Sequence, residues 1–285
     1  MGTKTPAIPF ESIGVEWRNL LDGEADEAAV QDFLERHPAL LPGGAGDIGP
    51  GGHHGPLFGC VFRQPPLKGL DSDRVPDFMW VTRSTVDITP ICIEIERPSK
   101  RWFTQDGHQT AEFTQAQNQL AQWASWFEHP ENQLLFRRVY AKDRFPNRLL
   151  RPQFVLIYGR QSEFEDSAHV LSSPARLQAR TKLARSNEYL RTFDSLYWEE
   201  KLATTVTVTL RPNDEFRVDW IPAWFDGLLD AQAAAFLGPA DHALDRNSDI
   251  DPQNRERIVE IWDQASEQSK RLQAGLTARA WPSSI

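Results

Sequence analysis

Apolar residues change between helical and strand spacing along the chain, and their order predicts an α/β fold. Helical spacing before residue 200 predicts three helices, at residues 26–37, 108–128 and 173–190. Between them, shorter apolar runs predict strands at residues 58–62, 75–82, 88–96 and 154–160. The unbroken apolar run of the last of these is typical of a strand buried on both faces. The order therefore indicates an α/β sandwich with a mixed central sheet flanked by helices.

The same pattern divides the chain into three parts. Residues 1–23 are a disordered-looking lead in which no element is predicted, and residues 24–200 hold the α/β domain. Residues 201–285 predict a small α+β extension, with a hairpin of strands 206–210 and 216–220 followed by helices at 223–237 and 252–276. An apolar stripe along the last helix either packs on the main domain or mediates self-association.

Composition narrows the class of protein and its compartment. The 285 residues carry a net charge of −9, which argues against broad electrostatic capture of nucleic acid. Only two cysteines are present, Cys60 and Cys92, and a reducing setting fits them better than a disulfide framework. The N-terminus lacks the basic and apolar stretches of a secretory signal, and no apolar run reaches the ~20 residues of a membrane span. A cytoplasmic protein without a membrane partner is expected.

Basic residues nevertheless gather after the long central helix, in a run with few acids. They are Arg137, Arg138, Lys142, Arg144, Arg148 and Arg151. Either the run is a solvated surface without a ligand, or it forms a locally basic face whose phosphate contacts are sensitive to salt. The charges alone leave both interpretations open.

The predicted strand at 88–96 carries two acids on one face. Isoleucines alternate there with Cys92, Glu94 and Glu96, and side chains two residues apart on a strand point the same way, about 6–7 Å apart. Each buried carboxylate costs several kcal/mol unless a positive charge compensates for it. A divalent cation is one such compensation, and buried arginines are another, with Arg97 and Arg101 available nearby.

A third acid belongs to the preceding strand. If the turn of the hairpin centres near Thr85, antiparallel pairing places Asp77 opposite Ile93 or Glu94. A slip of one residue would turn Asp77 to the other face. With the expected register, three carboxylates converge at one end of the hairpin and predict a site for a hard cation such as Mg²⁺.

Asp77, followed seventeen residues later by Glu94-x-Glu96, resembles the PD-(D/E)XK nuclease signature. Flanking segments follow the order seen in Shedu-type antiphage nucleases: DEAAVQDFLERHPALL at 26–41, ERP after the acids, the Gln-Leu of the long helix, VLIYGR at 155–160 and TFDSL at 192–196. The resemblance covers roughly residues 24–200. It implies a PD-(D/E)XK-like fold and a homo-oligomeric endonuclease that uses Mg²⁺ or Mn²⁺ to hydrolyse DNA phosphodiester bonds in bacterial defence against phage.

The resemblance also suggests roles for single residues. Asp77 and Glu94 are the expected metal ligands, with the Ile95 carbonyl as a third. The family pattern favours lysine two residues after the strand glutamate, and here Glu96 stands in that position. Glu96 is therefore either a general base or a further metal ligand, or it marks a weak or inactive nuclease-like module that binds nucleic acid or a phage protein.

Two helix residues complete the candidate site. Glu27 matches the helix acid of the family, which serves a second metal or steers a water, but an acid at a helix N-terminus also interacts favourably with the helix dipole. Gln119 of the long helix is placed either to hydrogen-bond a site carboxylate or the scissile phosphate, or to face solvent. The sequence leaves both alternatives open.

Overall fold

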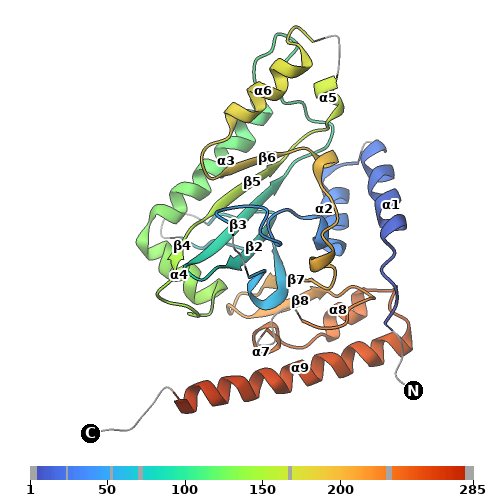
Figure 1. The fold of residues 1–285 in the computed structure, drawn as a ribbon, viewed down its shortest axis with the longest axis vertical. Helices are drawn as coiled ribbons and strands as arrows, with labels where there is room; N and C mark the ends of the chain where they lie inside the picture. The colour runs from blue at the N-terminus through green and yellow to red at the C-terminus, as the bar shows by residue number, and fades with distance from the viewer. Residues whose placement is uncertain are drawn as a thin grey trace.

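The computed structural model describes residues 5–23, 25–51, 54–69, 73–165, 169–228 and 233–279, the side chains of 273–279 excepted. Within these ranges one mixed sheet of eight strands forms the centre of the molecule, with helices on both sides (Figure 1). The strand order is β6-β5-β3-β2-β1-β7-β8, and β4 also pairs with β3. The strands are β1 Cys60–Arg63, β2 Phe78–Arg83, β3 Asp87–Ile95, β4 Leu149–Leu150, β5 Gln153–Ile157, β6 Glu188–Arg191, β7 Val206–Leu210 and β8 Phe216–Trp220. The predicted mixed α/β class is confirmed.

Helices pack on both faces of this sheet. The α-helices are α1 Phe10–Asp22, α2 Glu27–Arg36, α3 Ala111–Glu128, α4 Pro130–Tyr140, α5 Ser162–Glu165, α6 Ser173–Leu183, α7 Ala234–Leu237, α8 Asp241–Arg246 and α9 Pro252–Arg279. Short 3₁₀ helices are η1 Pro38–Leu40, η2 Leu57–Gly59, η3 Phe193–Ser195 and η4 Glu200–Leu202. In the part of the chain that the structure describes, no helix combines the length and apolar character that a membrane crossing requires.

Strand β3 contributes to a separate core on each face of the sheet. Its last three isoleucines, Ile91, Ile93 and Ile95, share a core with Val30 and Leu34 of α2. Ile88 and Cys92 instead share a core with Phe113 and Leu120 of α3. Strand side chains alternate between faces, so the acid that follows Cys92 by two residues shares the α3 face. Both cysteines are buried, and neither forms a disulfide bond.

Three strands end at the same edge of the sheet. β5 runs parallel to β3, and β6 runs parallel to β5, so their carboxyl ends meet. The predicted helix at 173–190 extends too far, because its last residues instead form a strand that pairs with a distant part of the chain. The helix stops at Leu183, and Glu188–Arg191 forms β6, because pairing with β5 overrides a local sequence that also suits a helix.

The N-terminal lead differs from the expectation. Residues Phe10–Asp22 form the amphipathic helix α1, which buries Ile13, Trp17 and Leu21. These positions repeat at i, i+4 and i+8, so the helical pattern was present in the sequence before residue 24. The expectation of a lead without an element is wrong.

Two other boundaries move for local reasons. The predicted strand at 58–62 begins only at Cys60, because Leu57–Gly59 forms a 3₁₀ turn in which Phe58 has φ of 67°. Of the predicted helix at 223–237, the described residues are helical only at Ala234–Leu237, and the non-helical residues 223–228 include Gly227. Residues 229–232 of that prediction lie outside the described residues.

The predicted C-terminal hairpin is confirmed as β7 and β8. It does not form a separate sheet, because β7 pairs in parallel with β1 and extends the central sheet. Helix α9 runs along this side of the molecule (Figure 1) and buries Ile258 and Trp262, so the start of its apolar stripe packs on the main body. Self-association through α9 stays a prediction.

Candidate metal centre

The β2–β3 hairpin brings Asp77 and Glu94 together. Phe78 pairs with Ile93, so the next position outward along each strand sets Asp77 against Glu94, and the predicted register is confirmed. A hydrogen bond joins the two carboxyl groups, which we call the acid pair. The backbone N–H of Ile95 donates to Oδ2 of Asp77 at 2.9 Å and fixes that carboxyl group at the end of the hairpin.

The acid pair lies at the shared carboxyl edge of the parallel strands. Glu94 pairs with Leu156 of β5, one residue before β3 ends. In open α/β sheets, ligands bind outside the carboxyl ends of the strands, where the loops that follow can reach them. The pair is therefore at the edge where a ligand site is expected.

Electrostatics keep protons on the acid pair. Burial raises the pKa of Asp77 to about 7, despite the hydrogen bond from Ile95, and the nearby carboxylates of Glu27 and Glu96 raise it further. Burial also raises the pKa of Glu94 to about 9, and Asp77 and Glu96 add to that shift. The pair therefore shares a proton at neutral pH, and a cation is the natural replacement for that proton.

Neither member of the acid pair is compensated by an arginine. In the described ranges, Asp77 and Glu94 make no contact with a guanidinium group, Arg97 is exposed, and Nε of Arg101 lies 4.0 Å from Oε1 of Glu163. Desolvated carboxyl groups without a positive partner are typical of functional sites, because structural acids are usually paired. This arrangement favours a cation over the alternative of acids satisfied by arginine.

Helix α2 directs Glu27 toward the same place. The side chain of Asp26 caps the helix by accepting the N–H of Ala29 at 2.8 Å, so the cap does not need Glu27. Burial raises the pKa of Glu27, and Glu96 is the next largest cause. Glu27 thus lies within electrostatic reach of the acids, and it also occupies the first helical turn, where the dipole favours an acid.

Glu96 is held by a lysine that lies four residues further along the chain. Nζ of Lys100 forms a short ion pair with Oε2 of Glu96, and both side chains are mostly buried. In the sequence, Lys100 is one of two basic residues, with Arg97, that follow closely on the predicted strand at 88–96. Its spacing of four from Glu96 was visible, but the turn between them contains Pro98, so helical spacing rules did not apply.

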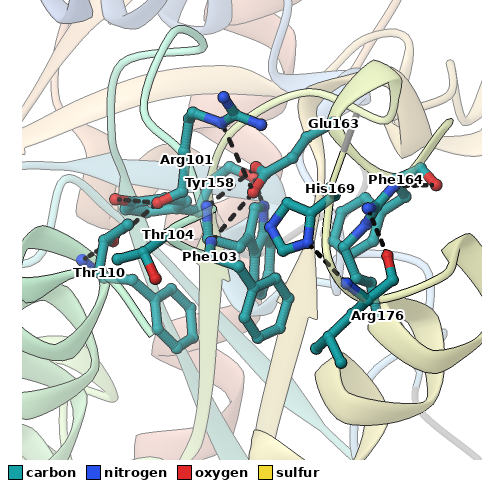
Figure 2. Close-up of polar contacts among 12 residues, drawn as sticks. Arg101, Phe103, Thr104, Thr110, Tyr158, Glu163, Phe164, His169 and Arg176 are labelled. Atoms are coloured by element: carbon teal, nitrogen blue, oxygen red, sulfur yellow. Dashed lines mark hydrogen bonds and ion pairs between the residues drawn. The ribbon is translucent and has the colours of Figure 1, made fainter. Parts of the chain in front are cut away.

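The segment that carries Lys100 is tied to β5 and α5, as Figure 2 shows around Glu163. The buried carboxylate of Glu163 accepts the backbone N–H groups of Trp102 at 2.9 Å and Phe103 at 3.0 Å. The indole of Trp102 donates to the carbonyl of Tyr158 at 2.9 Å. The side chain of Thr110 donates to the carbonyl of Arg101 at 2.7 Å. Sequence reasoning missed this network, whose acid comes more than sixty residues after Glu96.

Gly159 lets this segment approach β5 closely. Its φ is +61°, and a Cβ there would lie 2.6 Å from the carbonyl oxygen of Lys100. Gly159→Ala is therefore expected to destabilise the protein by more than the ~1–2 kcal/mol that a left-handed alanine costs. The matched control is Gly51→Ala, because Gly51 has φ of +77° with nothing within 4 Å of a Cβ. Denaturant unfolding of both variants measures the difference, and equal losses would show that the approach to Lys100 is not tight.

The remaining predicted residues are less closely joined to the site. Ile95 contributes its N–H to Asp77, and the predicted metal contact of its carbonyl stays a prediction. Gln119 is half-buried on α3, and among the described residues no hydrogen bond joins it to Asp77, Glu94 or Glu96. Its expected contact with a site carboxylate or a phosphate also stays a prediction.

The acid pair has the donor set of a magnesium site that is open to substrate. In the described part of the chain, no three His, Cys, Asp or Glu side chains form a ready cage for a metal ion. Mg²⁺ is usually held by one or two carboxylates, with water and substrate phosphates as its other ligands, so two converging acids fit it without such a cage. Carboxylate oxygens suit Mn²⁺ equally. The expected role of Glu96 as a further ligand is untested, since Lys100 holds that carboxylate.

The chain matches a known protein family. A protein-family model described as "Shedu protein SduA, C-terminal" matches residues 24–197, which is well over half of the chain. No curated protein matches at a significant level. The matched region runs from just before α2 to the end of η3 and contains the acid pair, Glu96 and Lys100.

Proposed function

The chain belongs to the Shedu family, through the region described as the SduA C-terminal part, and from that premise we propose that it is a metal-dependent endonuclease acting on DNA. Membership of this family suggests a role in antiphage defence. The observation that carries the chemical part of the proposal is the acid pair, two neighbouring desolvated carboxyl groups with raised pKa values at a sheet edge where ligands bind.

Asp77 and Glu94 would hold the cation, which is Mg²⁺ or Mn²⁺. When bound, such an ion stabilises negative charge on a phosphate and makes a bound water more acidic. Asp77 is oriented for this role by the N–H of Ile95, and Glu94 by its place within β3. The carboxyl group of Glu27 lies near the acid pair, and its negative charge would strengthen cation binding there.

Lys100 and Glu96 would supply the other half of the site. Lys100 brings an ammonium group beside Glu96, which stands where the family pattern has a lysine, two residues after the strand glutamate. A positive group at that position stabilises the charge that develops on a phosphate during hydrolysis. Glu96 then orients Lys100, and the tie from Glu163 to Trp102 and Phe103 restrains the same segment.

One observation favours a second function. The ammonium of Lys100 is engaged by Glu96, and an ammonium that stays bound to a carboxylate does not contact phosphate. On that account the protein is a nuclease-like module that binds nucleic acid or a phage protein without cutting. A single DNA-cleavage assay distinguishes the two functions.

Incubation with supercoiled plasmid and linear DNA in Mg²⁺ or Mn²⁺ tests the proposal. Wild-type protein is expected to cut DNA with the cation and to stop when EDTA is added. Asp77→Asn is expected to be inactive, whereas the control Glu112→Gln, which removes an exposed acid of α3, retains activity. DNA that stays intact while still bound by the wild type would favour the binding module instead.

A further inference from the structure

Three arginines surround one aromatic ring, and a fourth is bound beside them, at the end of the sheet opposite the acid pair. The guanidinium carbons of Arg83, Arg144 and Arg148 lie 5.3, 5.1 and 3.9 Å from the ring centroid of Phe145. Nη2 of Arg137 donates to the carbonyl oxygen of Arg148 at 2.7 Å and brings a fourth guanidinium to the group. We call Arg83, Arg137, Arg144 and Arg148 the arginine cluster.

Two members of the arginine cluster have no acidic partner in the described parts of the chain. Arg137 and Arg148 form no ion pair there, and Nη1 of each is buried without a hydrogen-bond partner. A buried charged donor without an acceptor costs free energy, and neighbouring guanidinium groups repel one another. An anion with several acceptor oxygens would offset both costs.

The loop that carries Arg144 and Arg148 has an unusual backbone. Lys142, Asp143 and Phe145 have φ of 49°, 54° and 58°, a region that residues other than glycine rarely adopt. The conformation is held by contacts, since Nζ of Lys142 donates to the carbonyl of Asp214 at 2.7 Å and lies 4.1 Å from the ring centroid of Phe216. Strained backbone that persists in this way clusters at ligand sites, and here it directs basic side chains around one ring.

The charge and shape of the cluster fit phosphate groups. Residues 137–151 contain six basic side chains and one acid, in a protein whose net charge is −9. Guanidinium groups match phosphate oxygens with paired N–H donors, and several of them along a surface follow successive phosphates of a strand. We propose that the arginine cluster is a second site that binds the phosphate backbone of nucleic acid. Only the choice of ligand rests on the proposed function.

The cluster is far enough from the acid pair to act on binding and not on the reaction itself. Arg83 ends β2, and Asp87, where β3 begins, binds Nε of Arg151 at 2.8 Å. Glu94 lies seven residue steps after Asp87 along β3, roughly 23 Å at strand spacing. Figure 1 shows β4 and α4 at one end of the sheet and α5 and α6 at the other. A duplex of about seven base pairs spans that distance, so one DNA molecule can reach both sites.

The test is DNA binding in EDTA, where cleavage does not interfere. Affinity for a short fluorescent duplex is measured over a range of NaCl concentrations for the wild type and Arg148→Gln. The variant is expected to bind about tenfold more weakly at low salt, and the slope of log affinity against log salt falls by about 0.9. Arg148→Lys, which keeps the charge without the planar fork, is expected to fall between them.

Arg138→Gln is the matched control. Arg138 is the neighbour of Arg137 on α4, but it is exposed and lines a hollow with Leu135 and Val139, away from Phe145. Arg138→Gln removes the same charge as Arg148→Gln and is expected to change the affinity for DNA by less than twofold. Thermal unfolding confirms that the variants fold. Nη1 of Arg148 is buried without a hydrogen-bond partner, so Arg148→Gln removes no hydrogen bond from that group.

Two outcomes overturn the proposal, and a third separates it from the proposed function. Equal affinities and salt slopes for the wild type and Arg148→Gln would do so. A rise in melting temperature with inorganic phosphate for the wild type alone, without any difference in DNA binding, would assign the cluster to a free anion instead. An inactive wild-type enzyme whose DNA binding still depends on Arg148 would contradict the proposed nuclease and leave this second site standing.

Discussion

Glu94→Gln is expected to abolish DNA cleavage and to make the metal-free protein more stable above neutral pH. Burial raises the pKa of Asp77 to about 7 and that of Glu94 to about 9 in the folded protein. A carboxyl group with a raised pKa binds more protons when folded, so its contribution to stability is present at low pH. That contribution is lost as the pH rises from about 4 toward those values. Glutamine has no charge to bury, so the variant keeps its stability.

Thermal unfolding in EDTA at pH 5 and pH 8 measures this effect. The melting temperature of the wild type should be lower at pH 8 than at pH 5, and that of Glu94→Gln should decrease less. Each kcal/mol of stability changes the melting temperature by about 2–4 °C. Adding Mn²⁺ at pH 8 should raise the melting temperature of the wild type and leave the variant unchanged. Glu112→Gln is the control on an exposed acid. If Glu94→Gln were less stable than the wild type at pH 8, burial of the two carboxyl groups would not destabilise the folded protein.

Lys100→Ala is the second change with a large expected effect. Removal of a group that stabilises charge on the reacting phosphate typically lowers the rate by about 10²–10³-fold. The acid pair remains, so Mn²⁺ binding measured by calorimetry should persist. Lys100→Arg keeps a positive charge near Glu96 and should retain part of the activity. The comparison separates loss of the positive charge from loss of the cation.

Arg97→Ala is the control for that variant. Arg97 lies in the same turn but is exposed, and its removal is expected to change cleavage by less than tenfold. Full activity of Lys100→Ala would contradict the role given to the lysine. In that case Glu96, two residues after Glu94, would take the role at this position, as a base or as a metal ligand.

The acid pair was predictable from sequence because it depends on local geometry. Alternation along β3 fixes the face of Glu94, and the short connection to β2 fixes the residue opposite it, so Asp77 followed from counting back through the hairpin. The position of Lys100 depends on Pro98, on the left-handed Gly159 and on the hydrogen bonds of Glu163. Contacts of that kind join distant segments, and spacing does not reveal them.

The same distinction separates the elements that were predicted from those that were not. Helix α2 and strand β5 have patterns strong enough to identify them alone. The strand β6 is four residues long and gains its identity from pairing with β5. Phe58 takes a left-handed conformation inside a run that suits a strand, since its ring packs between Phe216 and Phe236. In both cases tertiary contacts outweigh local propensity.

A crystal structure of the protein grown with Mn²⁺, with anomalous diffraction data, tests the central claim most directly. The account predicts an anomalous peak between the carboxylates of Asp77 and Glu94, in place of the hydrogen bond that joins them without metal. A map with no peak there, and with the two side chains still bound to each other, would contradict it.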